Sequence, residues 1–169
     1  DIDNFWKAFE ACQNMPAIVQ EKIFDSVYIK NASKCLKEII TINNLTARGF
    51  VNQINSEREY FLKCRSVTKK IRSYEDEIIR YLKKLKTIYP AAKYCDIYFM
   101  FTQFYTGGQS KNSGIAIGMD FWSLPDSTAI EFKNSLFSEL IRRIDVIPVT
   151  ILHELIHRNQ SIKNSGSLL

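Results

Sequence analysis

The sequence lacks several features that would assign a protein to a well-defined class. It has no run of about 18 consecutive apolar residues, so we expect no membrane-spanning helix in this chain. It contains no internal repeat, low-complexity tract or obvious linker. Its glycine-bearing segment 106–114 has neither the spacing nor the Lys-Ser/Thr pair of a phosphate-binding P-loop. Repeat proteins and P-loop nucleotide hydrolases are therefore excluded.

Cysteine is sparse and irregularly spaced. None of the four cysteines forms a Cys-x-x-Cys pair, which argues against a zinc ribbon and against a thioredoxin-type redox site. Their positions in predicted helices or just before a predicted strand favour buried free thiols, with two long-range disulfides as the alternative. The four residues are Cys12, Cys35, Cys64 and Cys95.

The composition is that of an ordinary globular domain. Of the 169 residues 46% are hydrophobic and 24% are charged, which is enough for one domain with its own core. The net charge of +5 arises mainly between residues 58 and 93, where acidic residues interrupt the basic ones at helical spacing. This pattern is typical of a solvated helix face. Nucleic-acid binding is the weaker alternative, because no recognisable binding module is present, and we expect no nucleic-acid partner.

Hydrophobic periodicity predicts a helical N-terminal part over residues 1–90. Apolar residues recur at helical spacing in five segments, and Ser33 is placed to cap the third of them. Pro90 ends the last helix. The five predicted helices cover residues 4–13, 18–24, 33–43, 46–73 and 74–89.

The second part, residues 91–169, changes in character. Residues 95–101 and 114–119 are short and rich in aromatic or β-branched side chains, which predicts two strands. The turn-rich segment 106–114 between them predicts a hairpin with a flexible tip. A helix over residues 127–143, capped by Ser127, is expected to follow. The sequence thus predicts a single, mainly helical α+β domain with a small antiparallel sheet ahead of its last helix.

The two histidines of the chain lie in one motif, His153-Glu154-Leu155-Ile156-His157. A helix predicted from about Pro148 to Ser161 stacks residues four apart on one face, so the two imidazoles can share a zinc ion with the Glu beside it as a general base. We therefore predict His153 and His157 as metal ligands and Glu154 as the catalytic residue. The alternative is an ordinary amphipathic helix whose polar residues are solvated.

A catalytic zinc normally has three protein ligands. Residues 158–169 contain no His, Asp, Glu or Cys. We expect the chain to stop short of its natural C-terminus, with the third ligand beyond Leu169; an upstream ligand and an incomplete site are the alternatives. Asp120, after a predicted strand, is the best upstream candidate, although a plain strand-end carboxylate is the more common role. The other upstream candidates are Glu131, Glu139, Asp145 and Cys95.

These residues predict zinc-dependent hydrolysis of peptide bonds. The metal would activate a water molecule, Glu154 would take its proton, and Gln160 or Tyr105 would stabilise the oxyanion. An exposed edge strand of the sheet would hold the peptide substrate over the zinc, and Gly114 and Gly118 would allow close backbone approach. The alternative is a non-catalytic binding or complex-forming protein with a degenerate metal site.

Several blocks of the sequence together resemble the bacterial gliding-motility lipoprotein B family, which is similar to predicted zinc-dependent proteases. The resemblance implies a zincin-like fold, zinc ligation by His153 and His157, and Glu154 as the base. It also implies a cell-envelope location, with a lipid anchor upstream and a further acidic segment downstream. The blocks are residues 4–9, Tyr98-Phe99, residues 107–118, and residues 153–157 with Gln160.

Overall fold

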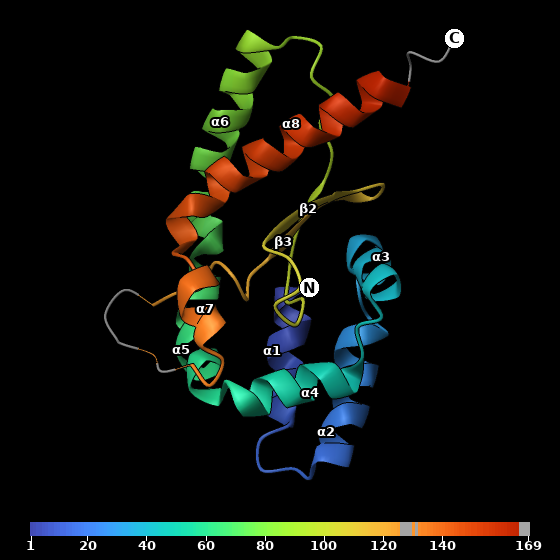
Figure 1. Cartoon of the computed structure of the whole chain (residues 1–169), viewed down its shortest axis with the longest axis vertical. Coiled ribbons are helices and arrows are strands. Elements are labelled where there is room, and N and C mark those ends of the chain that lie inside the picture. The colour runs from blue at the N-terminus through green and yellow to red at the C-terminus, as the bar shows by residue number, and fades with distance from the viewer. Residues whose placement is uncertain (126–129, 131, 166–169) are drawn as a thin grey trace.

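The structure is a computed structural model that describes residues 1–125, 130 and 132–165, with side chains as far as Gln160. Helices surround a small central sheet (Figure 1). The mainly helical α+β class predicted from the sequence is confirmed. In the described part, no helix is long and apolar enough to cross a membrane.

The first half of the chain is helical, as predicted. Ser33 caps its helix, since its hydroxyl accepts a hydrogen bond from the Leu36 N–H at 3.2 Å. The basic residues of the last two helices lie mostly on exposed faces, in agreement with the solvated face expected there. The elements are α1 (Ile2–Ala11), α2 (Ala17–Ile23), η1 (Phe24–Ile29, π-helical), α3 (Lys34–Asn43), α4 (Ala47–Ser56), α5 (Arg58–Lys69), η2 (Lys70–Tyr74, 3₁₀) and α6 (Glu75–Ile88).

The single helix predicted over residues 46–73 is wrong, because the chain breaks at Glu57 between α4 and α5. Glu57 is buried and has non-helical dihedral angles. Its carboxylate accepts hydrogen bonds from the backbone N–H groups of Lys133 (3.1 Å) and Asn134 (3.3 Å). The break thus allows the Glu57 carboxylate to bind residues 133 and 134. Helical periodicity is a local pattern and does not indicate such a long-range contact.

The core is built around stacked aromatic rings from both halves of the chain. Phe5 of α1 stacks on Phe101, with ring centroids 3.7 Å apart. The Trp6 indole N–H donates to the Thr68 hydroxyl at 3.0 Å, so its polar atom is satisfied in the core. Three of the four cysteines are buried, Cys95 is half-buried, and all four are free thiols.

The sheet differs from the predicted antiparallel hairpin. It has three strands, β1 (Ile97–Met100), β2 (Gly108–Lys111) and β3 (Gly114–Gly118), in the order β1-β3-β2. β1 runs parallel to β3, and only β2 is antiparallel to it. The two predicted strands are therefore neighbours in a parallel pair, while part of the predicted flexible tip forms the missing strand β2. Small and polar residues such as Gly108 and Ser110 carry little strand propensity, so local sequence does not reveal β2.

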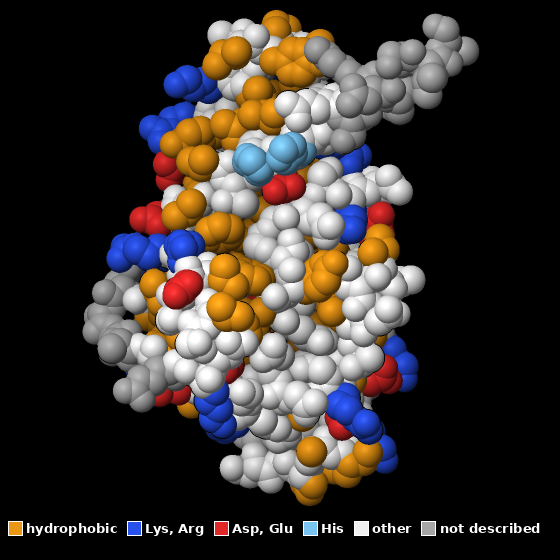
Figure 2. All heavy atoms as spheres, viewed as in Figure 1, with side chains coloured by type: hydrophobic (Ala, Val, Ile, Leu, Met, Phe, Trp, Pro, Cys, Tyr) orange, Lys and Arg blue, Asp and Glu red, His pale blue; other side chains and the backbone are white. Residues whose placement is uncertain are grey.

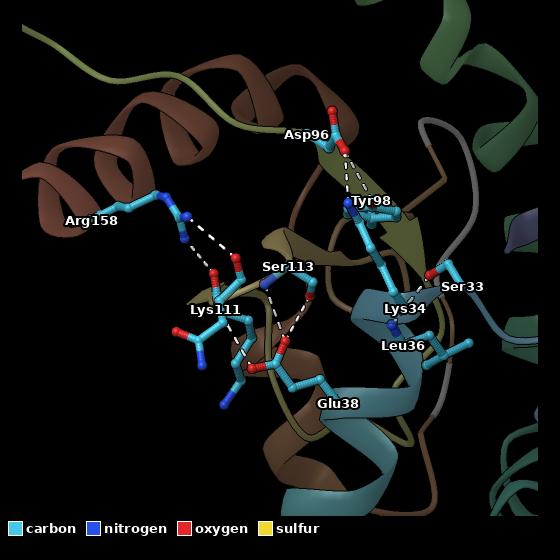
Figure 3. Close-up of polar contacts among 10 residues, drawn as sticks. Ser33, Lys34, Leu36, Glu38, Asp96, Tyr98, Lys111, Ser113 and Arg158 are labelled. Atoms are coloured by element: carbon cyan, nitrogen blue, oxygen red, sulfur yellow. Dashed lines mark hydrogen bonds and ion pairs between the residues drawn. The ribbon is translucent and has the colours of Figure 1, made fainter.

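Charged side chains hold the β2–β3 turn from two helices. Figure 3 shows Glu38 of α3 accepting hydrogen bonds from the Ser113 backbone N–H (3.2 Å) and hydroxyl (2.7 Å). On the other side, Arg158 donates to the backbone carbonyls of Lys111 and Asn112. The carboxylate satisfies the donors of the turn and the guanidinium its acceptors, so the turn is fixed relative to both helices.

The C-terminal elements are α7 (Ser135–Leu140), η3 (Ile144–Val146, 3₁₀) and α8 (Ile147–Ser165). In the described part, the helix predicted over residues 127–143 is confined to α7, and Asn134 caps it by accepting from the Leu136 N–H. The predicted cap Ser127 lies outside the described residues. Beyond α7 the backbone is extended at Ile141, and the Arg142 N–H donates to Phe121 O at 2.7 Å, a tertiary contact that replaces the helical bond.

Candidate metal centre

The motif helix α8 packs against α6 and against β2 and β3. It begins at Ile147 with Pro148 in its first turn, close to the predicted start. Ile147, Ile151 and Leu155 recur every four residues and are buried, which fixes one face of the helix in the core. Ile156 lies off that face and is 41% exposed. The opposite face carries both histidines at the molecular surface.

The two imidazoles converge on each other. The Nε2 atoms of His153 and His157 lie 2.9 Å apart, and the ring planes are 89° to each other. Figure 2 shows the two rings side by side on the surface, with a carboxylate next to them. This is the arrangement expected from the four-residue spacing on a helix.

Gln160 contacts the second histidine. Its Oε1 lies 3.3 Å from His157 Nδ1, so the carbonyl can accept a hydrogen bond from Nδ1–H and leave Nε2 unprotonated, with its lone pair toward His153 Nε2. Metal-binding histidines are commonly oriented in this way by a hydrogen bond to the other ring nitrogen. Gln160 is thus placed to orient His157, a role different from the oxyanion contact that the sequence suggested.

The Glu154 side chain extends from α8 toward strand β2. A methyl group added at Gly108 would be 3.2 Å from Glu154 Oε1 and 3.1 Å from Thr150 Cγ2. Gly108 therefore lets β2 approach the carboxylate side of the helix closely. Sequence reasoning passed over this glycine, whose one signal was the adjacent pair Gly107-Gly108.

The two glycines that the sequence analysis singled out do permit close approach, but to the chain's own backbone. A Cβ at Gly118 would lie 1.9 Å from Thr106 O, and one at Gly114 would lie 2.4 Å from Asp96 O. Gly114 also has a φ of 151°, which side-chain-bearing residues rarely adopt. Their role is to pack the sheet and its turn.

Asp120, the favoured upstream ligand candidate, lies in the core. It is 1% exposed, and its Oδ2 accepts hydrogen bonds from the backbone N–H groups of Thr102 (2.9 Å) and Phe104 (2.6 Å). The Thr102 hydroxyl lies 3.1 Å from Oδ1. Burial raises the pKa of this carboxyl to about 6, although the hydrogen bonds from Phe104 and Thr102 oppose the shift. These bonds identify Asp120 as a structural carboxylate.

The other upstream candidates within the described residues do not complete a site either. Asp145 is exposed and pairs with Arg143 at 3.5 Å, Glu139 is exposed on α7, and Glu131 lies outside the described residues. Among residues 1–125, 130 and 132–165, no three His, Cys, Asp or Glu side chains form a group that could hold a metal ion. Tyr105 is an exposed loop residue, and no described contact joins it to the histidines. The described part therefore brings together His153, Glu154, His157 and Gln160.

Comparison with known proteins provides no relative: no family model matches this chain, and neither the curated proteins nor the solved structures contain a match. The resemblance to the gliding-motility lipoprotein B family accordingly stays a prediction.

Proposed function

We propose that this protein hydrolyses peptide bonds with a zinc ion held by His153 and His157 and with Glu154 as the general base. The convergence of the two Nε2 atoms, 2.9 Å apart on the surface of α8, is the observation that carries the proposal. Glu154 adjoins the pair on the same helix. Two converging imidazoles with an adjacent carboxylate match two zinc ligands and the general base of a zinc hydrolase.

The spacing of the imidazoles fits a zinc ion after a small adjustment. Two nitrogen ligands at about 2.05 Å from a tetrahedral ion are about 3.3 Å apart. The observed 2.9 Å is about 0.4 Å shorter and suits a hydrogen bond between one protonated and one unprotonated Nε2. A small rotation of either side chain opens the pair, and Gln160 Oε1 is positioned to keep the His157 proton on Nδ1. We expect the third ligand to come from outside the described residues.

A bound zinc ion would supply the Lewis acidity that lowers the pKa of water toward neutrality. The residues of the chain then have separate roles. Glu154 accepts the proton of the attacking water and returns it to the leaving nitrogen, as a general base that becomes a general acid. Gln160 holds the tautomer and orientation of His157.

The substrate class is an extended peptide lying along strand β2. Gly118 N–H donates to Gly107 O, so residues 107, 109 and 111 bond to β3, while the backbone groups of Gly108 and Ser110 face the outer edge of β2. The Thr106 hydroxyl donates to Gly108 O at 2.9 Å, so an added chain would pair with the Gly108 N–H and the Ser110 backbone. This edge adjoins Glu154, because Gly108 lies against that side chain. An extended chain added there would run beside the carboxylate. The cell-envelope location with a lipid anchor belongs to this proposal only through the family resemblance.

The alternative function is a non-catalytic binding or complex-forming protein. The absence of a third donor beside His153 and His157 within the described residues favours it. Hydrolysis of an unfolded, fluorescently labelled protein separates the two functions. We expect cleavage that stops after chelation and returns when zinc is added. A zinc-loaded protein that cleaves nothing would leave the alternative, with the metal in a structural role.

A further inference from the structure

A large cavity lies away from the histidine pair, at the outer edge of β1. It has a volume of about 1120 Å³ and is bounded by α1, by the α5–η2–α6 segment and by β1. None of its lining residues within the described part of the chain comes from α8. Its β1 wall is formed by Ile97, Tyr98 and Phe99.

β1 is an edge strand, and its hydrogen-bonding pattern shows which backbone groups face outward. Ile115 N–H donates to Asp96 O (2.9 Å) and Met119 N–H donates to Met100 O (2.7 Å), so the even-numbered carbonyls face β3. Backbone groups alternate in direction along a strand, so those of the odd-numbered residues face away from β3. The backbone N–H and C=O groups of Ile97 and Phe99 therefore face the cavity side.

At Phe101, the next odd-numbered residue, a side chain satisfies the outward-facing backbone groups. The Tyr28 hydroxyl accepts from the Phe101 N–H and donates to Phe101 O, each at 2.9 Å. A buried side chain thus takes the place of a neighbouring strand at Phe101. At Ile97 and Phe99 the cavity occupies that position, and within the described part no hydrogen bond joins their backbone groups to another residue.

The remaining walls of the cavity suit a polypeptide. They combine aliphatic side chains with charged side chains of both signs, among them Lys7, Lys69, Arg72, Asp3 and Glu75. A nucleic acid or an anionic membrane would require a rim of one positive sign. An extended chain supplies backbone donors and acceptors in the spacing of a strand, with side chains on alternate faces. The aliphatic lining residues are Ile2, Ile71, Ile78, Ile79, Leu82 and Ile97.

We propose that this cavity is a binding groove for an extended segment of a partner protein, which adds to β1 as a fourth strand. The segment places aliphatic side chains against Ile78 and Leu82 and bonds to the backbone of Ile97 and Phe99. Pockets of about 300–1000 Å³ already hold drug-sized ligands, so the observed volume accommodates several extended residues. The groove works independently of His153 and His157.

The test uses a soluble seven-residue peptide of alternating valine and threonine with one Lys and one Glu, and a second peptide in which the ladder-forming amides are N-methylated. We expect the first peptide to bind and to slow amide hydrogen exchange of Ile97 and Phe99 by about tenfold, whereas N-methylation abolishes binding. Binding that instead protects Gly108 and Ser110 would overturn the proposal in favour of the β2 edge. No binding, or equal binding of the N-methylated peptide, would also overturn it.

A matched pair of variants isolates the backbone contact. Phe99→Val removes the ring and keeps the N–H, whereas Phe99→Pro also removes the donor at an edge position, where proline is tolerated. We expect Phe99→Pro to bind the peptide about fivefold more weakly than Phe99→Val. Equal affinity of two folded variants would contradict the strand addition. His153→Ala should bind the peptide like the wild type.

Discussion

Asp120 and Glu154 are carboxylates in opposite surroundings. Asp120 is enclosed in the core and receives hydrogen bonds from Thr102 and Phe104, whereas Glu154 is half-buried next to two surface imidazoles. A carboxylate whose lone pairs are already used inside the protein supports the fold. One that keeps open lone pairs beside possible metal ligands can exchange protons with a substrate. Burial and partners, more than residue type, separate the two roles.

The largest expected effect is the loss of hydrolysis when the Glu154 carboxylate is replaced. Glu154→Gln keeps the shape of the side chain but cannot accept a proton from water, so hydrolysis should fall by roughly 10² to 10⁴. Zinc content should stay unchanged, and it is measured beside the rate of hydrolysis. Glu139→Gln, on the exposed surface of α7, serves as the matched control. A zinc-loaded Glu154→Gln variant with wild-type activity would show that the base is another residue.

Removal of the buried Asp120 carboxylate should affect stability instead. Asp120→Ala leaves the N–H groups of Thr102 and Phe104 without their acceptor in the core, and we expect a loss of about 2–4 kcal/mol in the free energy of unfolding. Urea denaturation measures it, with the exposed Asp145→Ala as control. An Asp120→Ala protein as stable as the wild type would remove the contrast between the two carboxylates.

The buried Asp120 carboxylate also predicts that the free energy of unfolding depends on pH. Burial raises the pKa of Asp120 to about 6 from an ordinary value of 3.8, so the folded state binds this proton more tightly than the unfolded state. The stabilisation is fully present below about pH 4 and is lost as the pH rises through 6, by roughly 3 kcal/mol in total. In Asp120→Asn this contribution is absent. Between pH 4 and 7 the free energy of unfolding of the wild type should fall relative to that of Asp120→Asn. A difference between the two proteins that stays constant over this range would contradict the assignment.

The sequence predicted the site around Glu154 better than the surroundings of Asp120. The positions of His153, Glu154 and His157 on α8 follow from local periodicity, which a single helix satisfies by itself. The surroundings of Asp120 depend on a connection that folds back on residues 102–104, and no local pattern encodes it. The break at Glu57 and the strand β2 were missed for the same reason, since contacts distant in sequence determine both.

A smaller effect is expected at the residue that orients His157. Gln160→Ala removes the acceptor of the Nδ1 proton, and loss of such an orienting bond typically weakens metal binding by about tenfold. Gln160→Glu retains an acceptor and should restore the affinity. Competition with a fluorescent zinc chelator compares the three proteins. Equal affinities in all of them would show that Gln160 does not orient the ligand.

The smallest predicted effect is at Gly108. An added methyl group displaces the Glu154 side chain by a few tenths of an ångström, so Gly108→Ala should slow hydrolysis by roughly threefold to tenfold and leave zinc affinity unchanged. The ratio of hydrolysis rate to zinc occupancy measures this. A variant that loses zinc instead would place β2 closer to the histidines than to the carboxylate.

Zinc titration followed by calorimetry tests the central claim, that His153 and His157 form one metal site, most directly. The wild type and Glu154→Gln should each bind one zinc ion per chain, because both keep the imidazole pair. His153→Ala and His157→Ala should each lose this binding while retaining the helical circular dichroism of the wild type. Zinc binding of unchanged stoichiometry and affinity in both alanine variants would contradict the account.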